Sequence, residues 1–433
     1  MMKKKITGLL LAAVIMAVAA GCSKDREADV SEEKEIITLT MFSNLPDRKT
    51  GQGLVEQMLI DEYMEANENI EIQVEVLDDE AYKTKFKAYA MEGMPDIVTI
   101  WGQPSFLDEI VEAGLLEALD TADYTEYGFV EGSLDGFTYE GRLYGLPRNT
   151  DVQCIFYNQK LFLDNGWEVP ATYEELLALA GEIKEAGYVP MAMDGGDGWP
   201  LAVYLSDVLY KMTGSGYGEL VSHAIKTGDF SATPFQEAAS LLKAAVDAGL
   251  FQPGYDSQDY STAVNLFTNG LAAMYYMGSW EVSMALDLDI PEEIRTNIRV
   301  FTMPVIEGGK GTAGDIAAWN GGGYAVSADS EVKEEAIRFL NYMYQPDKLS
   351  KYGWENGAGM SAQDQSEYMT GEETQLQKQI VEILNQADSL SGTPINDRGP
   401  SAFKVSIESK IQSMSNGSVS VDAFLEIIGN FCK

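Results

Sequence analysis

The chain has 433 residues, with 68 Asp and Glu against 30 Lys and Arg, and its formal net charge is -38 at pH 7. Such an excess of negative charge excludes nucleic-acid binding, which depends on neutralising phosphates. His223, the only histidine, stands in a polar context and is interpreted as a surface residue, so neither a histidine-rich zinc site nor a histidine-dependent triad is expected.

The N-terminus has the organisation of a secretory signal. Three lysines precede an apolar run over residues 9–20, which is too short to span a membrane but has the length of a signal-peptide core. The run ends in Ala19-Ala20-Gly21-Cys22, which resembles the lipobox of bacterial lipoproteins, although leucine is commoner at the position of Ala19. We therefore expect a signal peptide over residues 1–21, a lipid on Cys22 that anchors the chain to the outer face of the cell membrane, and a charged tether over residues 22–35. The alternative is an ordinary signal peptide with an accidental cysteine.

The body that follows is longer than one hydrophobic core usually supports, so two lobes are expected. Alternating apolar residues predict strands over residues 36–42 and 70–76, and a short buried strand over 96–101. Helical patterns lie between and after these strands, and this order predicts a parallel α/β sheet covered by helices. Thr172 and Glu175 have the spacing of a capping box and predict a helix start. Further helices are expected over residues 54–67, 81–92, 106–113, 201–211, 235–248, 403–415 and 421–428, and further strands over 150–157, 271–277, 300–304 and 323–326.

Several segments match part of a known binding motif but lack the features that the motif requires. Residues 309–314 match G-x-G-x-x-G, but no helix pattern opens after them, so a loop is predicted and not a nucleotide site. Residues 194–198 hold two acids among glycines and lack the remaining ligands of a calcium loop, so no metal and no cofactor are expected. Cys154 and Cys432 do not form a disulfide framework. The chain has enough acids to supply two facing carboxylates, so a secreted glycosidase is an alternative.

Four motifs then resemble, in order, those of the family 1 extracellular solute-binding proteins of ABC importers, the maltose- and multiple-sugar-binding type. They are GMPDIVTIW at 93–101, GLP at 145–147 with FYNQKLF at 156–162, PATYEEL at 170–176, and FTNGLAAM at 267–274 with GSW at 278–280. The resemblance implies two hinged α/β lobes of the periplasmic-binding-protein type II fold, with the ligand in the cleft between them. It places chain crossings near residues 148–151, 303–304 and 345, so the lobes would be 36–150 plus 304–345, and 151–303 plus 346–433.

The same resemblance implies capture of a mono- or oligosaccharide and delivery to an ABC permease, without catalysis; we expect a monomer. Trp101 ends a predicted strand, where α/β sheets bind ligands, and Trp280 follows another, so two indoles are expected to face each other across a sugar. Asp151 would accept sugar hydroxyls because carboxylates offer only acceptors. The other candidate ligand-binding residues are Ser43, Asn44, Arg148, Asp194, Asp197, Trp199, Trp319, Asn320, Asp397 and Arg398.

Two points remain open about the ligand. Lys404 stands roughly where maltose-type relatives have a third tryptophan, which puts a maltodextrin in doubt. A non-sugar solute such as a polyamine, a metal complex or a phosphorylated metabolite is an alternative, and Asp151, Asp194 and Asp197 would supply the acidic cluster that a cation needs. In either case we expect binding to shift the population of a hinged protein towards its closed form.

Overall fold

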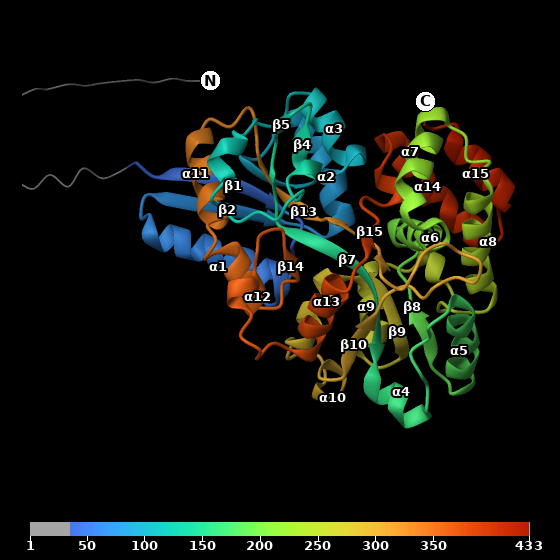
Figure 1. The fold of residues 1–433 in the computed structure, drawn as a ribbon. Coiled ribbons are helices and arrows are strands. Elements are labelled where there is room, and N and C mark those ends of the chain that lie inside the picture. Colours follow the sequence, from blue (N-terminus) through green and yellow to red (C-terminus); the bar gives the residue numbers. More distant parts are fainter. Residues whose placement is uncertain (1–34, 433) are drawn as a thin grey trace, which may run out of the picture. The chain divides into compact units, whose positions relative to one another are not determined.

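The computed structural model describes residues 35–432, so the expected signal peptide, Cys22 and all of the tether except Glu35 lie outside the described residues. None of the helices within 35–432 combines the length and apolar composition needed to cross a membrane. Two α/β lobes form this part of the chain (Figure 1).

The first lobe is a five-stranded sheet in the order β2-β1-β3-β13-β6 with helices on it. In β2, Ile70 and Ile72 are buried and Glu71 is exposed, as alternation requires. The expected parallel pairing holds for β1 with β2 and β3, whereas β13 returns antiparallel to β3, so the sheet is mixed. The strands are β1 (Ile37–Ser43), β2 (Ile70–Val76), β3 (Ile97–Trp101), β6 (Leu146–Pro147) and β13 (Gly322–Val326); the helices are α1 (Gly51–Ala66), α2 (Asp79–Glu92), α3 (Pro104–Glu112), α11 (Lys333–Met343) and α12 (Leu349–Glu355).

The second lobe is built on a sheet in the order β10-β7-β9-β8, in which β8 and β9 are parallel and the other pairs antiparallel. The capping box of Thr172 and Glu175 is present and starts α5, as predicted. The strands are β7 (Asn149–Asn158), β8 (Val189–Ala192), β9 (Ala272–Gly278) and β10 (Ile298–Phe301). The helices are α4 (Gln159–Asn165), α5 (Tyr173–Glu185), α6 (Trp199–Thr213), α7 (Tyr217–Thr227), α8 (Thr233–Asp247), α9 (Tyr260–Thr268), α10 (Glu292–Arg295), α13 (Gln375–Asn385), α14 (Ser401–Ser415) and α15 (Val421–Gly429).

Strand β7 links the lobes (Figure 1). It follows directly on β6 of the first sheet, and its first residues pair with β12 (Ala318–Asn320) and β14 (Met360–Ser361) before it enters the second sheet. Three connections therefore run side by side at the junction, which is the arrangement a hinge requires.

Two crossings differ from those expected. Met303 and Ile306 pack in one core cluster of the second lobe, and Ile316 and Ala318 in another, so the chain returns to the first lobe at residues 320–322 and not at 304. Leu349 and Ala358 pack in the first-lobe core, whereas Leu376 and Ile380 pack in the second, so the last crossing lies between residues 358 and 376 and not near 345. The physical reason is that residues 304–318 bond to α5 and α6, as in the bond from Tyr173 N–H to Val305 O (2.9 Å).

The G-x-G-x-x-G segment forms a loop, as predicted. It packs against the end of α6, where Gly311 N–H donates to Lys211 O (2.8 Å) and the buried Lys211 ammonium donates to Thr312 O (2.9 Å). A β-carbon on Gly311 would lie 2.6 Å from Lys211 O, so glycine is needed for this close approach. His223 is exposed on α7, and within residues 35–432 Cys154 and Cys432 are both free.

Candidate functional site

A cleft of about 790 Å³ lies between the lobes and at the strands that join them. Side chains from α2 and α3 of the first lobe and from α6, α9 and the segment after β9 of the second lobe line it. Nine of the thirteen candidate ligand-binding residues lie on its surface: Asn44, Trp101, Arg148, Asp151, Asp197, Trp199, Trp280, Trp319 and Asp397.

Three half-buried indoles gather on the second-lobe side of the cleft. The ring centroids of Trp199 and Trp280 are 6.0 Å apart, and those of Trp280 and Trp319 are 6.5 Å apart. Trp280 is the second residue of the 3-10 helix η5 (Ser279–Ala285), just after β9, and its ring folds back over Gly278, where a β-carbon would lie 1.9 Å from it. Because Gly278 has no side chain, the Trp280 ring can lie against it and form an aromatic platform at the end of β9.

Trp101 lies on the opposite, first-lobe side, at the end of β3. Phe106 and Tyr82 hold its ring edge-on, at centroid distances of 5.0 and 5.7 Å. The Lys83 ammonium lies 5.4 Å from the Trp101 ring centroid, a cation–π contact. Indoles therefore line both walls of the cleft, and the indole on the first-lobe wall contacts a lysine.

Arg148 and Asp151 lie at the base of the cleft, beside the junction. Arg148 is 6% exposed, and its Nε and Nη1 have no hydrogen-bond partner. Its guanidinium lies 5.3 Å from the ring centroid of Tyr324. Burial raises the pKa of Asp151 to about 7, although Arg148 and a hydrogen bond from Asn149 offset part of the shift. This pair offers both free donors and acceptors to a ligand.

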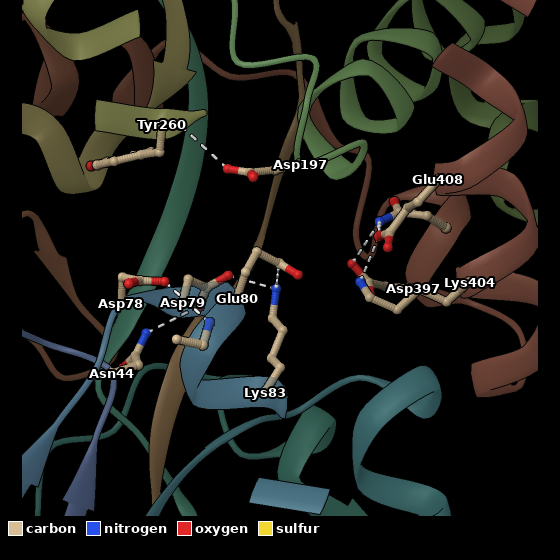
Figure 2. Close-up of polar contacts among 12 residues, drawn as sticks. Asn44, Asp78, Asp79, Glu80, Lys83, Asp197, Tyr260, Asp397, Lys404 and Glu408 are labelled. Carbon is tan, nitrogen blue, oxygen red and sulfur yellow. Dashed lines mark hydrogen bonds and ion pairs between the residues drawn. The ribbon is translucent and has the colours of Figure 1, made fainter. Parts of the chain in front are cut away.

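The start of α2 brings a charged cluster to the first-lobe wall (Figure 2). Asp78 caps the helix by accepting from Ala81 N–H (3.1 Å). One turn on, Lys83 forms ion pairs with Asp79 (2.5 Å) and Glu80 (2.8 Å), and Asn44 donates to Asp79 (3.3 Å). Asp79 and Glu80 therefore share one lysine of the protein as their ion-pair partner.

A second cluster comes from the C-terminal part of the chain (Figure 2). Lys404 on α14 pairs with Asp397 (2.5 Å) and Glu408 (2.9 Å), and Asp397 also accepts from Ser105 Oγ (2.6 Å). Ser105 belongs to α3 of the first lobe and Asp397 to the 3-10 helix η7 (Ile395–Asp397) of the second, so this hydrogen bond joins the lobes across the edge of the cleft.

The acids of the second-lobe wall have tyrosines as hydrogen-bond partners. Asp197 accepts from Tyr260 N–H (3.3 Å), and Glu281 accepts from the hydroxyls of Tyr260 and Tyr275. Burial raises the pKa of Glu281 to about 7; burial, and after it the like charge of Glu80, raises the pKa of Asp197 to about 6.

Four candidates do not line the cleft. Ser43 is buried and donates to Glu56 (3.0 Å), because successive side chains of a strand alternate between its faces. Asp194 is fully buried beneath the wall. Asn320 donates to Gly132 O (3.2 Å), and Arg398 to Thr393 O (2.6 Å). The side chains of Ser43, Asn320 and Arg398 are therefore engaged in hydrogen bonds within the protein.

Sequence reasoning did not select Lys83, Tyr260, Glu281 or Lys404, all of which line the cleft. Helix α2 begins just beyond the carboxyl end of β2, where open α/β sheets bind ligands, and that signal pointed to Lys83. Glu281 directly follows Trp280, so the reason for selecting Trp280, its position after a predicted strand, applied to Glu281 as well. Lys404 was noted as a departure from the maltose-type pattern, and no role was expected for it.

Two hinged α/β lobes with a deep cleft define a binding protein of the periplasmic type II fold, as predicted. Residues 48–348 match the model of the bacterial extracellular solute-binding protein family. The chain belongs to this family, whose members bind solutes and are not enzymes.

Named relatives and solved structures agree with this assignment. The multiple sugar-binding protein of Streptococcus mutans is 26% identical over 359 residues, 81% of this chain and 80% of the relative. The galactooligosaccharide-binding protein of Bacillus subtilis is 23% identical over 351 residues, 78% of this chain and 77% of the relative. A solved structure from work on xylan utilization by Caldanaerobius polysaccharolyticus has a TM-score of 0.81 at 26% identity and covers 91% of this chain and 99% of its own. A chitin oligosaccharide binding protein, with a TM-score of 0.80 at 22% identity, covers 92% of this chain and 98% of its own and shows the same fold.

Proposed function

We propose that this chain is the carbohydrate-binding component of an ABC importer. The observation that carries the proposal is the group of three indoles, Trp199, Trp280 and Trp319, on one wall of the cleft. Flat aromatic faces stack on the apolar faces of pyranose rings, while neighbouring carboxylates accept from the hydroxyls. The names of the relatives from S. mutans and B. subtilis, which refer to multiple sugars and galactooligosaccharides, support the same class of ligand.

The size of the cleft favours an oligosaccharide over a monosaccharide. Its volume of about 790 Å³ lies in the upper part of the range of about 300–1,000 Å³ that ligand pockets occupy. A single sugar ring would leave much of the lining without contacts, whereas a short chain of rings reaches both Trp101 and the three indoles opposite.

Hinge closure is the mechanism that we propose. A ligand that contacts both walls gains its full set of contacts only when the lobes close, so binding shifts the population towards the closed form. The permease would then recognise the closed protein. The buried, partnerless donors of Arg148 at the junction favour hydroxyl-rich ligands, because an unsatisfied buried donor is costly.

We also propose that the protein is held at the outer face of the cell membrane by a lipid on Cys22. This part of the proposal is supported by the lipobox-like sequence ahead of a charged tether. One related solved structure, at 18% identity, is described as a secreted solute-binding lipoprotein. The glycosidase alternative is no longer supported, because the chain belongs to a family of binding proteins.

A thermal-shift screen of the purified mature protein tests the function. Short neutral oligosaccharides form one arm, and a polyamine, a chelated metal and a sugar phosphate form the others. We expect at least one saccharide to raise the melting temperature, because ligands that bind only the native state stabilise it. If only a non-sugar compound raises the melting temperature, the ligand belongs to that solute class and not to the carbohydrates.

A further inference from the structure

The two walls of the cleft differ in how their acids are neutralised. On the first-lobe wall, Asp79 and Glu80 share Lys83 at 2.5 and 2.8 Å. At the C-terminal edge, Asp397 has Lys404 at 2.5 Å. Each of these carboxylates therefore contacts a lysine ammonium, which Asp79 shares with Glu80 and Asp397 shares with Glu408.

The second-lobe wall has acids without such a partner. Within residues 35–432, no ion pair includes Asp197 or Glu281, and their hydrogen-bond donors are the neutral groups of Tyr260 and Tyr275. Tyr260 joins the two acids, because its N–H donates to Asp197 and its hydroxyl to Glu281. Figure 2 shows Lys83 across the cleft from Asp197, where it is already held by its own two acids.

An independent observation comes from the residue behind this wall. Asp194 is fully buried, and neither of its carboxylate oxygens has a hydrogen-bond partner. Burial, and then the like charges of Asp197, Glu281 and Asp259, raise its pKa well above the usual range. The three carboxyl groups of Asp194, Asp197 and Glu281 thus lie close enough to influence one another, and no ion pair within residues 35–432 includes any of them. Ionising such buried groups is costly unless a cation lies beside them.

The indoles stand beside these acids. Trp280 directly precedes Glu281, and Trp199 lies two residues after Asp197. A sugar ring stacked on this platform would carry its substituents to the two carboxylates. Indole faces also attract ammonium groups, so the same platform suits a cationic substituent.

We propose that the cleft selects a saccharide that bears a free amino group, with Asp197 and Glu281 receiving its ammonium. The inference rests on the proposed carbohydrate-binding function and names the chemical class of the sugar. The ammonium supplies the counter-charge that this wall lacks and makes charge-assisted hydrogen bonds, which are shorter and stronger than those of a hydroxyl. The first-lobe wall, where Lys83 pairs with Asp79 and Glu80, binds the neutral part of the saccharide.

The experiment is calorimetry of the mature protein at neutral pH with three probes of equal length and linkage. They are a β-1,4-linked glucosamine oligomer, its fully N-acetylated counterpart and the glucose oligomer. We expect the free amine to bind at least about tenfold more tightly than the other two.

Two variants and a control locate the effect. Glu281→Gln and Asp197→Asn should each lower the preference for the amine over the glucose oligomer several-fold. The control is Asp289→Asn, which removes an exposed carboxylate at the rim and should keep the preference. Circular dichroism and melting curves confirm that each variant is folded.

The outcomes are distinct. Binding of neutral or acetylated oligomers as tight as that of the amine, or an amine preference that survives both variants, overturns this inference and leaves the carbohydrate function intact. If none of the three probes and none of the saccharides in the thermal-shift screen binds, the proposed function itself fails.

Discussion

The hydroxyl of Ser105 on α3 donates to the carboxylate of Asp397 on η7, at 2.6 Å, and so ties the first lobe to the second. A second bond of the same kind runs from Ser401 on α14 to Glu109 on α3, also at 2.6 Å. Both bonds can form only while the lobes are together, so they stabilise this arrangement of the two lobes.

Removal of this interlobe contact should weaken ligand binding. We expect Ser105→Ala to raise the dissociation constant about fivefold, because one hydrogen bond contributes about 1 kcal/mol and a smaller closed population lowers the apparent affinity. Calorimetry measures the affinity, and small-angle scattering should show a larger radius of gyration for the unliganded variant. Ser240→Ala on α8, whose hydroxyl bonds within its own helix, serves as the control. An unchanged affinity in Ser105→Ala would contradict a role in closure.

Loss of the central indole should have a larger effect. Trp280→Ala removes the ring that contacts both Trp199 and Trp319, and we expect binding to fall by about thirtyfold or more, as at other aromatic hot spots of about 2 kcal/mol. Ligand addition should change the tryptophan fluorescence of the wild type. Trp167→Phe, in the core of the second lobe and not among the cleft residues, should bind normally. Wild-type binding by both Trp280→Ala and Trp101→Ala would show that the site lies elsewhere.

The platform also depends on the glycine beneath it. In Gly278→Ala, the new methyl group would overlap the Trp280 ring and force it to move. The backbone angles of Gly278 are open to alanine, with φ at -88°, so we expect weaker ligand binding with little change in the melting temperature. A crystal structure of the variant would show the displaced ring. Equal loss of stability and affinity would indicate a general folding defect.

The buried Glu281 should make stability depend on pH. Burial raises its pKa from 4.5 to about 7. Between these values the folded protein holds a proton that the unfolded chain releases, so the free energy of unfolding falls as the pH rises, and above about pH 7 the full cost of roughly 3 kcal/mol is present. Glu281→Gln should therefore be more stable than the wild type at about pH 8 and equal to it near pH 4 in urea denaturation without ligand. A pH-independent difference would contradict this account.

Membrane attachment should depend on one sulfur atom. Cys22→Ser should stop lipidation and move the protein from the membrane fraction to the soluble extracytoplasmic fraction, with its ligand affinity unchanged. Mass spectrometry of the wild type should find a diacylglyceryl group at the N-terminal cysteine. Retention of the serine variant on the membrane would contradict the lipoprotein assignment.

Local patterns predicted most of the fold. The alternation in residues 70–76 and the capping box at Thr172 depend only on neighbours along the chain, and both are present. The crossings at residues 304 and 345 were misplaced because the segments around them have no periodic pattern. Their lobe is decided by distant partners, such as the bond from Tyr173 to Val305.

Part of the site could be predicted from positions that follow a strand. Trp101 and Trp280 were selected for this reason, and both line the cleft. Lys83 on α2 and Tyr260 at the start of α9 also line the cleft, but neither position directly follows a predicted strand. Asp194 was selected because it lies in a glycine-rich loop after a predicted strand, but the fold turns it inward, which no local pattern indicates.

The place of β13 in the first sheet has a consequence for biosynthesis. Residues 322–326 fill the position between β3 and β6, so the sheet stays divided until that late part of the chain has left the ribosome. Contacts between residues so far apart in sequence form slowly. The first-lobe sheet of the nascent polypeptide is therefore incomplete until residues 322–326 have been made, and a chain with an incomplete sheet is easier to thread through a narrow export channel.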